Sequence, residues 1–479
     1  MKRKILILLS LLLTVSLAGC NKDTIEQNEA SNVDYSTISL NDITEDMQLI
    51  DIRQEYKYIG WTDDKSIGGH IPDAVDFPEN WLSMDFTNAA ISTDMTLELA
   101  RREIDLGKAT VIYDNDTASE ESFNKYADLG FKKLTVLDGG FKAYTNIQKD
   151  IASLENYQFY VHPQWLQDLV DGQTPETYTG DDFKIIEISL ASEDGDYEEG
   201  HIPGAINIDD SINHVPGVRV LEEYEAIPLE KQLTFWNKNN DQVTKSKLEE
   251  MGITKNTTVI LYGSTSATTA ASRAALIMKY AGVEDIRILN GGKTLWTMEN
   301  RKLESGVNTP LRVDFGTTVP KHPEVIVNYD DELAMVNNPD AVIASIRSWD
   351  EYTGKVSGYT YIGEAGDVAN SRFGYAGSGP YSMEDYRNVD NTMFNYEIIA
   401  KRWAKWGIVP DKKVSFHCGT GWRASETYFY AYAMGWDNIT VYDGGWYEWH
   451  KYPESPRKDA GIPSDAPEQK PDSFFMSEK

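Results

Sequence analysis

The sequence predicts an α/β fold made of three tandem domains, each a parallel sheet flanked by helices. One observation is a repeated segment: residues 136–141 recur as 288–293 and 441–446, at spacings of 152 and 153 residues, about the length of one domain. Another is the alternation of short β-branched runs with helical patterns. The runs expected to form strands include 110–113, 258–262, 413–417 and 439–442.

The N-terminus has the pattern of a targeting segment. Three basic residues precede an almost wholly apolar run, residues 5–17, which is too short to favour a membrane-spanning helix over a cleaved signal. Leu17-Ala18-Gly19-Cys20 is similar to a bacterial lipobox. We expect residues 1–19 to be a lipoprotein signal peptide and Cys20 to be the lipidated first residue of the mature chain, held on the extracytoplasmic face of the cell membrane. A retained membrane anchor is the alternative.

Residues 20–35 are polar and acidic and are expected to form a flexible tether. The three repeats then cover residues 36–150, 155–305 and 320–455. The first two open alike: an apolar run is followed by Gly-His-Ile-Pro, in which proline and glycine favour a tight turn. We expect His70 and His201 of these turns to be structural. Residues 456–479 form a polar tail rich in Pro, Asp, Lys and Ser, which we expect to be disordered.

Cys418 is the candidate nucleophile. The chain has 2 cysteines, and with Cys20 lipidated no intramolecular disulfide is available. The run 414–417 has strand character, Gly419 and Gly421 allow a tight loop, and a helix-like run follows up to Gly435. A strand, a loop and a helix N-terminus form an anion cradle of inward-pointing N–H groups. A cysteine at its base is expected to be largely thiolate near neutral pH.

The corresponding positions of the other repeats carry no such residue. Asp114 stands there in the first repeat, followed by Asn115 and Asp116, and its acids would repel an anionic substrate. Gly263 stands there in the second repeat, before a Ser/Thr loop without an evident base to activate a hydroxyl. We therefore expect the first two repeats to be catalytically inactive and dispensable for chemistry.

The segment from Cys418 to Arg423, followed by a helix and then by Asp-Gly-Gly-Trp, resembles the active-site half of a rhodanese (thiosulfate sulfurtransferase) domain. The openings of the first two repeats resemble the rhodanese opening, Asp-x-Arg and then Gly-His-Ile-Pro-Gly-Ala. The resemblance covers most of residues 36–455. The six-residue loop matches the rhodanese length, whereas the related dual-specificity phosphatases have a loop one residue longer.

The resemblance implies a mechanism. The Cys418 thiolate would take the outer sulfur of a donor such as thiosulfate, and a thiol or cyanide would then remove it from the persulfide. Substrate-binding residues would be Gly419, Thr420, Gly421, Trp422, Arg423 and Arg347: the loop N–H groups stabilise the sulfur anion, the two arginines hold the donor's anionic end, and Trp422 shapes the pocket mouth. Arg423 could instead pair with a nearby acid and brace the loop. His417 points away from Cys418 by strand alternation.

The third repeat departs from the pattern at its start. It keeps Arg347 but has Ser345 in place of the aspartate, and it lacks the Gly-His-Ile-Pro turn. An insert, residues 371–391, rich in Gly, Tyr and Ser, follows. Such a loop either controls access to the site or elaborates the surface.

The net charge of −31, from 76 acidic and 45 basic residues, argues against electrostatic binding of nucleic acid or anionic headgroups. The expected partners are a small-molecule sulfur donor, a thiol or cyanide acceptor, and a membrane through the N-terminal lipid only. We expect no metal and no cofactor besides the covalent persulfide. Alternative functions are a surface scaffold or sulfur carrier with little turnover, and a cysteine phosphatase or arsenate reductase using the same cradle.

Overall fold

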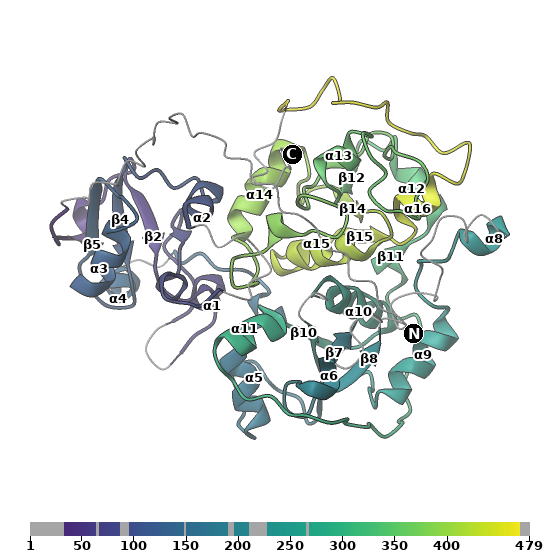
Figure 1. The fold of residues 1–479 in the computed structure, drawn as a ribbon, viewed down its shortest axis with the longest axis horizontal. Coiled ribbons are helices and arrows are strands. Elements are labelled where there is room, and N and C mark those ends of the chain that lie inside the picture. The colour runs from purple at the N-terminus through teal and green to yellow at the C-terminus, as the bar shows by residue number, and fades with distance from the viewer. Residues whose placement is uncertain are drawn as a thin grey trace, which may run out of the picture.

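Three five-stranded parallel sheets follow one another along the chain, each flanked by helices, so the predicted fold class is confirmed (Figure 1). The computed structural model describes residues 33–63, 67–86, 95–147, 150–189, 196–209, 228–264 and 268–469. The signal peptide, Cys20 and nearly all of the tether lie outside these ranges. Within them, no helix is both long and apolar enough to cross a membrane.

The first repeat has the strand order β1-β5-β4-β2-β3. Its strands are β1 (Thr37–Ile38), β2 (Gln48–Asp51), β3 (Val75–Asp76), β4 (Ala109–Tyr113) and β5 (Lys133–Leu137). Its helices are α1 (Glu55–Ile59), α2 (Met95–Arg101), α3 (Glu120–Ala127) and α4 (Gly140–Ile147). Apolar and β-branched residues make the central strand β4 almost wholly buried, as expected of a parallel sheet covered on both faces.

The second repeat repeats this order as β6-β10-β9-β7-β8. Its strands are β6 (Tyr160–Val161), β7 (Phe183–Ser189), β8 (Ile206–Asp209), β9 (Thr258–Gly263) and β10 (Asp285–Leu289). Its helices are α5 (Pro163–Val170), α6 (Asp196–Glu199), α8 (Leu229–Gln232), α9 (Asp241–Glu250), α10 (Thr268–Ala281) and α11 (Gly292–Met298).

The third repeat has the same order again, β11-β15-β14-β12-β13. Its strands are β11 (Ile326–Val327), β12 (Ala341–Ser345), β13 (Arg372–Phe373), β14 (Lys413–His417) and β15 (Ile439–Tyr442). Its helices are α12 (Tyr329–Met335), α13 (Trp349–Tyr352), α14 (Tyr396–Lys405), α15 (Trp422–Ala433) and α16 (Gly445–Trp449). The strands expected at 413–417 and 439–442 are found with those bounds.

Repeats two and three share one hydrophobic core. Helices α10 and α15 lie side by side between the two sheets (Figure 1), and most residues of both are buried. One cluster of buried apolar side chains runs through both helices and into both sheets. Repeat one has apolar clusters largely of its own and lies beside this pair (Figure 1).

The C-terminal tail corrects an expectation. We expected residues 456–479 to be disordered, but residues 456–469 follow repeat three as an irregular segment, the yellow coil along the top of Figure 1. Arg372 donates to Asp465 at 2.7 Å, and Glu468 accepts from Tyr375 at 2.9 Å and from the Trp406 indole at 3.0 Å. These polar contacts give the tail a fixed course that its composition does not predict.

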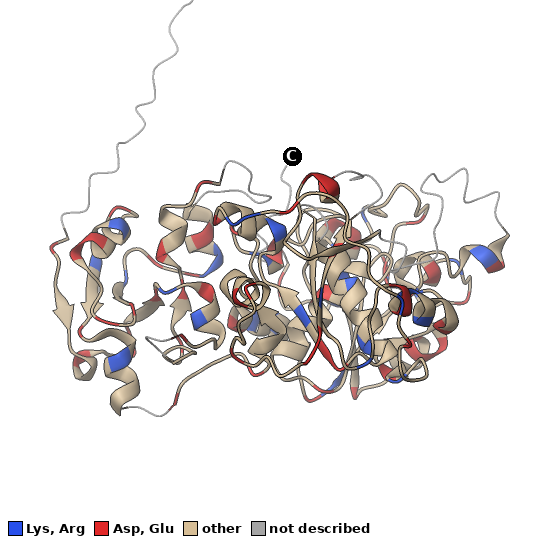
Figure 2. Ribbon diagram, turned by 90° about the horizontal axis from the view of Figure 1, so that it is seen from below, with Lys and Arg blue, Asp and Glu red and all other residues tan. Residues whose placement is uncertain are grey.

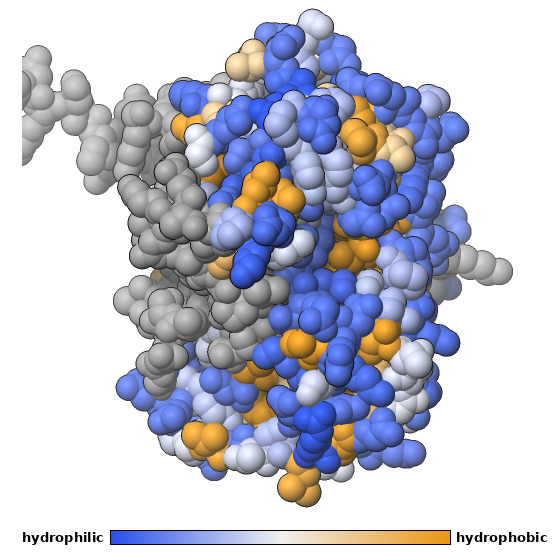
Figure 3. Space-filling model, turned by 90° about the vertical axis from the view of Figure 1, so that its right-hand side faces the viewer, coloured by the Kyte–Doolittle hydropathy of each residue, from blue (hydrophilic) through white to orange (hydrophobic). Residues whose placement is uncertain are grey.

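Charged residues of both signs are interspersed along the whole ribbon (Figure 2). The face in Figure 3 is mostly hydrophilic where its residues are described, with apolar side chains scattered over it.

Candidate active site

Cys418 lies at the carboxyl end of β14, where parallel sheets place their sites. β14 is a central strand, and its register with β12 pairs His417 with Ser345. The Cys418 side chain is fully buried, with 0% exposure, and its thiol is free. The candidate nucleophile therefore sits at the base of the loop, closed off from solvent in this structure.

Two glycines in left-handed conformations shape the loop. Gly421, with φ of 80°, is the N-cap of α15. Gly445, with φ of 55°, lets the start of α16 approach so closely that a Cβ there would lie 2.7 Å from the Cys418 carbonyl oxygen. Trp446 and Tyr447 then donate backbone N–H groups to the carbonyls of Cys418 and Gly419 at 2.8 and 2.9 Å. The repeated Gly-Gly pair thus locks the outer side of the loop.

The inner side of the loop is a set of N–H groups. No acceptor in the described ranges contacts the backbone N–H of Gly419, Thr420, Gly421 or Arg423. α15 begins at Trp422, so the positive partial charge of its N-terminus lies beside these N–H groups. Thr420 is buried, and Trp422 is half-buried and packs against the shared core. This arrangement can bind a sulfur or oxygen anion next to Cys418.

Glu351 joins both predicted arginines in one buried network. Arg423 donates to the two Glu351 oxygens at 2.9 and 3.0 Å, and the Arg347 Nε lies 3.3 Å from Oε1. Burial opposes ionisation of Glu351, but Arg423 and Arg347 prevail and lower its pKa to about 2. Arg423 thus has the bracing role, the second of its two expected roles. Arg347, with 0% exposure, is likewise paired, and donor binding by either arginine stays a prediction.

Asp367 supplies the carboxylate that Ser345 lacks. Ser345 Oγ donates to Asp367 at 2.7 Å, and His417 Nε2 lies 3.2 Å from its other oxygen. Burial would raise the pKa of Asp367, yet His417 and Arg347 hold it well below its usual range. His417 faces this acid rather than the nucleophile, as strand alternation predicts. In repeat three the carboxylate therefore comes from Asp367, in the loop before β13, and not from the end of β12.

An aromatic cover closes the cradle. A Cβ on Gly419 would overlap the Tyr359 ring, so this ring lies directly on the loop. Tyr359 stacks on Tyr361 at 5.1 Å and meets Tyr381 edge-on at 5.0 Å. Tyr361 in turn lies 4.9 Å from Trp236 of repeat two. A row of aromatic contacts therefore runs from the ring that covers the Cys418 loop to repeat two.

The insert, residues 371–391, lies on the site and joins the three repeats. At its tip, the Pro380 carbonyl accepts from the Tyr359 hydroxyl at 2.6 Å and the Gly379 carbonyl lies 3.3 Å from Arg423. Toward repeat one, Asp390 accepts from the Trp81 indole at 2.7 Å. Toward repeat two, Asn391 donates to Thr268 at 3.1 Å. Both roles considered for this segment therefore have contacts behind them, and the contacts with the site favour control of access.

Repeat two also buttresses the loop directly. Arg273 on α10 forms a buried ion pair with Asp443, whose carbonyl oxygen lies against Gly421, and Lys238 donates its backbone N–H to the same acid at 2.8 Å. We expected the upstream repeats to be dispensable for chemistry, but these contacts make repeat two part of the support of the site.

Repeats one and two carry Asp114 and Gly263 at the position of Cys418, as predicted. In β2 and β4, Asp51 is paired with Tyr113, just as Ser345 is paired with His417, and Glu187 is paired with Tyr262 in repeat two. Asp114 also accepts the backbone N–H of Phe141 at 2.8 Å, as Cys418 accepts that of Trp446. The matching strand registers thus show that the three loops occupy the same position in their repeats.

His70 and His201 are buried, and their ring nitrogens contact residues other than Cys418. His70 contacts the Ile71 carbonyl at 3.0 Å and the Tyr396 hydroxyl at 2.9 Å. His201 contacts the Tyr197 carbonyl at 2.8 Å and Glu304 at 3.2 Å. Both hold the Gly-His-Ile-Pro turns in place, which is the structural role that we expected.

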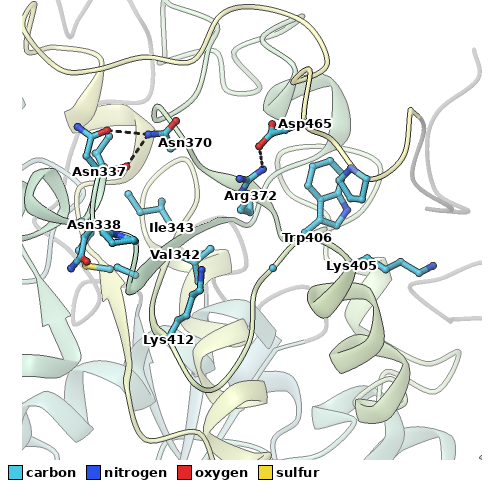
Figure 4. A pocket seen from close by; sticks show the side chains of 16 residues that line it. Asn337, Asn338, Val342, Ile343, Asn370, Arg372, Lys405, Trp406, Lys412 and Asp465 are labelled. Carbon is cyan, nitrogen blue, oxygen red and sulfur yellow. Dashed lines mark hydrogen bonds and ion pairs between the residues drawn. The ribbon is translucent and has the colours of Figure 1, made fainter.

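A cavity of about 510 Å³ opens at the opposite end of the strands of the third sheet from Cys418 (Figure 4). It lies at the start of β12 and beneath the tail, where Asn337 contacts Asn370 and Asp465 contacts Arg372. Because these are the amino ends of the strands, this cavity is separate from the Cys418 loop. Among the described residues, no group of three His, Cys, Asp or Glu side chains is arranged to hold a metal ion.

Sequence reasoning missed Glu351, Asp367, Tyr359 and Arg273. Glu351 had a usable signal, because it follows Arg347 by four residues, the spacing of helical ion pairs. No local sequence pattern marks the other three. Tyr359 and Asp367 lie in the loop between α13 and β13, and Arg273 belongs to α10 of repeat two.

Comparison with known proteins places these observations in a family. The Rhodanese-like domain family matches this chain three times, at residues 38–147, 162–299 and 329–452. The thiosulfate sulfurtransferase YnjE of Escherichia coli is 36% identical over 414 residues, covering 85% of this chain and 88% of that protein. The sulfur carrier protein TtuD of Thermus thermophilus is 28% identical over 265 residues, covering 53% of this chain and 83% of that protein.

Solved structures show the same architecture. Wild-type EanB matches with a TM-score of 0.80 and 33% identity, covering 90% of this chain and 99% of that one. An anaerobic ergothioneine biosynthesis enzyme from Chlorobium limicola, solved with its natural substrate trimethyl histidine, also matches with a TM-score of 0.80 and 33% identity, over 90% of this chain and 100% of that one. EanB variants changed at a tyrosine, a cysteine and a threonine were solved with hercynine or ergothioneine, one with ergothioneine linked to a cysteine persulfide.

Those three EanB positions are separated along the chain by the same numbers of residues as Tyr359, Cys418 and Thr420 here. The repeated sheets, the Cys418 loop and the matches over all three repeats together lead to one conclusion: the chain belongs to the rhodanese-like sulfurtransferase family, as three tandem domains.

Proposed function

We propose that this protein transfers sulfane sulfur through a persulfide on Cys418, with thiosulfate as a donor. The Cys418 thiolate attacks the outer sulfur of the donor and a new S–S bond forms. The bond between the two donor sulfurs breaks, and its electron pair leaves with sulfite. The N–H groups of the loop and the N-terminus of α15 stabilise the anionic persulfide sulfur. The observation that carries this proposal is the free cysteine at the base of an anion cradle.

In the second half of the cycle, an acceptor attacks the outer persulfide sulfur and Cys418 leaves as thiolate. Cyanide would become thiocyanate, and a thiolate would become a persulfide. Cys418 then returns to its starting thiolate state, with no net oxidation of the protein. Because the donor product leaves before the acceptor reacts, the kinetics are ping-pong.

Entry of the donor needs a movement, because Cys418 is fully buried. Tyr359 covers Gly419, and its hydroxyl is bound by the insert at Pro380. We propose that displacement of this ring together with the insert tip opens the cradle.

An imidazole betaine such as hercynine is a second candidate acceptor. The specific observation is the shared spacing of Tyr359, Cys418 and Thr420 with the tyrosine, cysteine and threonine varied in EanB. The Tyr359 ring, which lies on the loop at Gly419, would also offer an aromatic face to a quaternary ammonium group. Sulfur from the persulfide would replace a hydrogen on the imidazole carbon, with that hydrogen leaving as a proton.

Sulfur transfer with little turnover is the other reading, since one relative is named a sulfur carrier. Mass spectrometry after thiosulfate treatment should show one added sulfur on Cys418 in the native protein and none in Cys418→Ser. Steady-state turnover with cyanide, a thiol or hercynine then identifies the acceptor. Persulfide formation without turnover would indicate a carrier, and turnover in folded Cys418→Ser would place the nucleophile elsewhere.

We further propose that Cys20 carries a lipid that anchors the protein at the cell surface. The lipobox similarity supports this. Metabolic labelling with a radioactive fatty acid should mark the native chain and leave Cys20→Ala unlabelled. Label retained by Cys20→Ala would rule the lipid anchor out at this residue.

A further inference from the structure

Repeat one retains a cavity at the place where repeat three has its active site. It has a volume of about 570 Å³ and lies at the carboxyl ends of β2 and β4. Its lining is entirely polar apart from one isoleucine and includes Arg53, Lys57, Asn80, Asp114 and Asn115. A repeat with Asp114 at the position of Cys418 thus has a space of the size that proteins use for small ligands.

Three buried polar atoms on residues that line this cavity lack partners in the described ranges: Arg53 Nη1, Asn80 Oδ1 and Asn115 Oδ1. Arg53 is decisive, because it is only 3% exposed and its other nitrogens are used. Nε and Nη2 bind the two Asp51 oxygens at 2.9 and 2.6 Å, and Nη2 also donates to the Gly69 carbonyl. A buried donor without an acceptor is costly unless a ligand or water completes it.

The charges around the cavity leave one carboxylate without a cation. Among the charged residues that line it, Lys57 pairs with Asp63 at 2.5 Å, and Glu79 and Asp116 pair with Lys125 at 2.6 Å and Lys142 at 2.8 Å. The Asp114 carboxylate forms no ion pair within the described part of the chain and accepts the backbone N–H of Asn115 at 2.7 Å. Burial raises the pKa of its carboxyl, which a facing cation would offset.

The unsatisfied set therefore consists of one guanidinium donor, two amide acceptors and one carboxylate. We propose that this cavity binds a small zwitterion of the α-amino acid class. The three unpartnered atoms are buried in this structure, so binding requires the side chains of Arg53, Asn80 and Asn115 to turn toward the cavity. The ammonium group would then lie against Asp114 and the two amide oxygens, and the carboxylate would accept from Arg53 Nη1. An anion alone would face Asp114, and a cation alone would leave Arg53 unsatisfied.

Titration calorimetry of the full chain with glycine, L-serine and L-glutamine tests the proposal. At least one of these should bind with millimolar or better affinity, and methylammonium and acetate, which each carry half of the zwitterion, should bind at least tenfold more weakly. The same ligand should raise the melting temperature of the protein in a concentration-dependent way.

Variants locate the site. Asp114→Asn keeps the shape and the Asn115 contact but removes the charge, and should weaken binding at least tenfold. Glu120→Gln removes the same charge from an exposed position of repeat one outside the cavity and should bind as the native chain does. Cys418→Ser should also bind normally, which separates this site from the sulfur-transfer site. Asn115→Ala provides an independent change should Asp114→Asn fail to fold.

Absence of binding by all three amino acids at 20 mM would overturn the proposal and leave ordered water as the content of the cavity. Equal affinity of Asp114→Asn or Asn115→Ala and the native chain would also overturn it, as would loss of binding in Cys418→Ser.

Discussion

Glu351 is the residue on which the two predicted anion ligands converge. It accepts both N–H groups of the Arg423 fork and lies next to Arg347, so neither guanidinium charge is free to act alone. Its pKa of about 2 means that the network stabilises the fold fully above pH 4.5, the ordinary value, and weakens as the pH falls toward 2. Part of the positive charge of Arg423 and Arg347 is thus neutralised by Glu351 within the protein.

Arg423→Ala should destabilise the protein by about 3–5 kcal/mol, because it leaves Glu351 buried with a weaker partner. The double variant Arg423→Ala/Glu351→Gln should recover part of this stability, since no uncompensated charge remains. Chemical denaturation measures both effects. If Arg423 also holds the donor, the double variant regains stability but not the rate of persulfide formation; full recovery of that rate would show that Arg423 only braces the loop.

Glu332 should make stability fall as the pH rises. It is fully buried under β14, accepts from Ser415, and burial raises its pKa to about 7. Because the unfolded chain gives up this proton near pH 4.5 and the folded chain near 7, the folded state loses up to about 3 kcal/mol between these values. Glu332→Gln should therefore gain melting temperature relative to the native chain at pH 8 and not at pH 4.5. Equal differences at both pH values would contradict the assignment.

At the scale of elements, the turn from β15 to α16 sets the shape of the Cys418 loop. Its second glycine, Gly445, packs against the carbonyls of Cys418 and Gly419. Gly140 makes the equivalent contact with Asp114 and Asp116 in repeat one. In repeat two, a Cβ on Gly292 would lie 3.8 Å from the Gly263 carbonyl, an ordinary contact. The second glycine of the recurrent pair is thus a packing requirement of the loop in repeats one and three.

Gly445→Ala should abolish turnover and cost more stability than an ordinary change at a left-handed glycine, which is about 1–3 kcal/mol. The added Cβ would lie 2.7 Å from two carbonyl oxygens of the loop. Gly407→Ala is the matched control, because its φ of 73° is also left-handed and a Cβ there has open space. Turnover and thermal unfolding of the pair separate the clash from the backbone strain. Equal loss in both variants would show that the contact with the loop is unimportant.

At the scale of the molecule, the third repeat is not an independent unit. α15 packs on α10 in a common core, Asp443 is held by Arg273, and the insert is bonded to both other repeats. Repeats one and two carry no cysteine at the position of Cys418, yet they contribute to the site. Repeat two contacts its aromatic cover, and both repeats bind the insert that lies on it.

A fragment of residues 313–479 should aggregate, because it exposes the apolar face of α15 that α10 covers. A fragment of residues 155–479 should fold, since it keeps that shared core, and should form the Cys418 persulfide. Size-exclusion chromatography and mass spectrometry compare them. A monodisperse, active 313–479 fragment would show that repeat two is dispensable after all.

The sequence by itself determined the three tandem α/β domains, the strand that carries Cys418, and the vacancy of the nucleophile position in the first two repeats. These features are local: a β-branched run, a glycine loop and a helix start are specified by residues adjacent along the chain, and repetition at domain length shows the same unit three times. Strand alternation was also enough to turn His417 away from Cys418.

Only the tertiary structure decided how the site is completed. Asp367 takes the place of an aspartate missing at Ser345, Tyr359 covers Gly419, and Arg273 of another repeat supports the loop. The polar tail, which looks disordered by composition, follows the surface of repeat three to residue 469. The physical reason is that such contacts join side chains far apart in sequence: burial, charge pairing and ring packing act through space, and no periodicity or spacing along the chain records them.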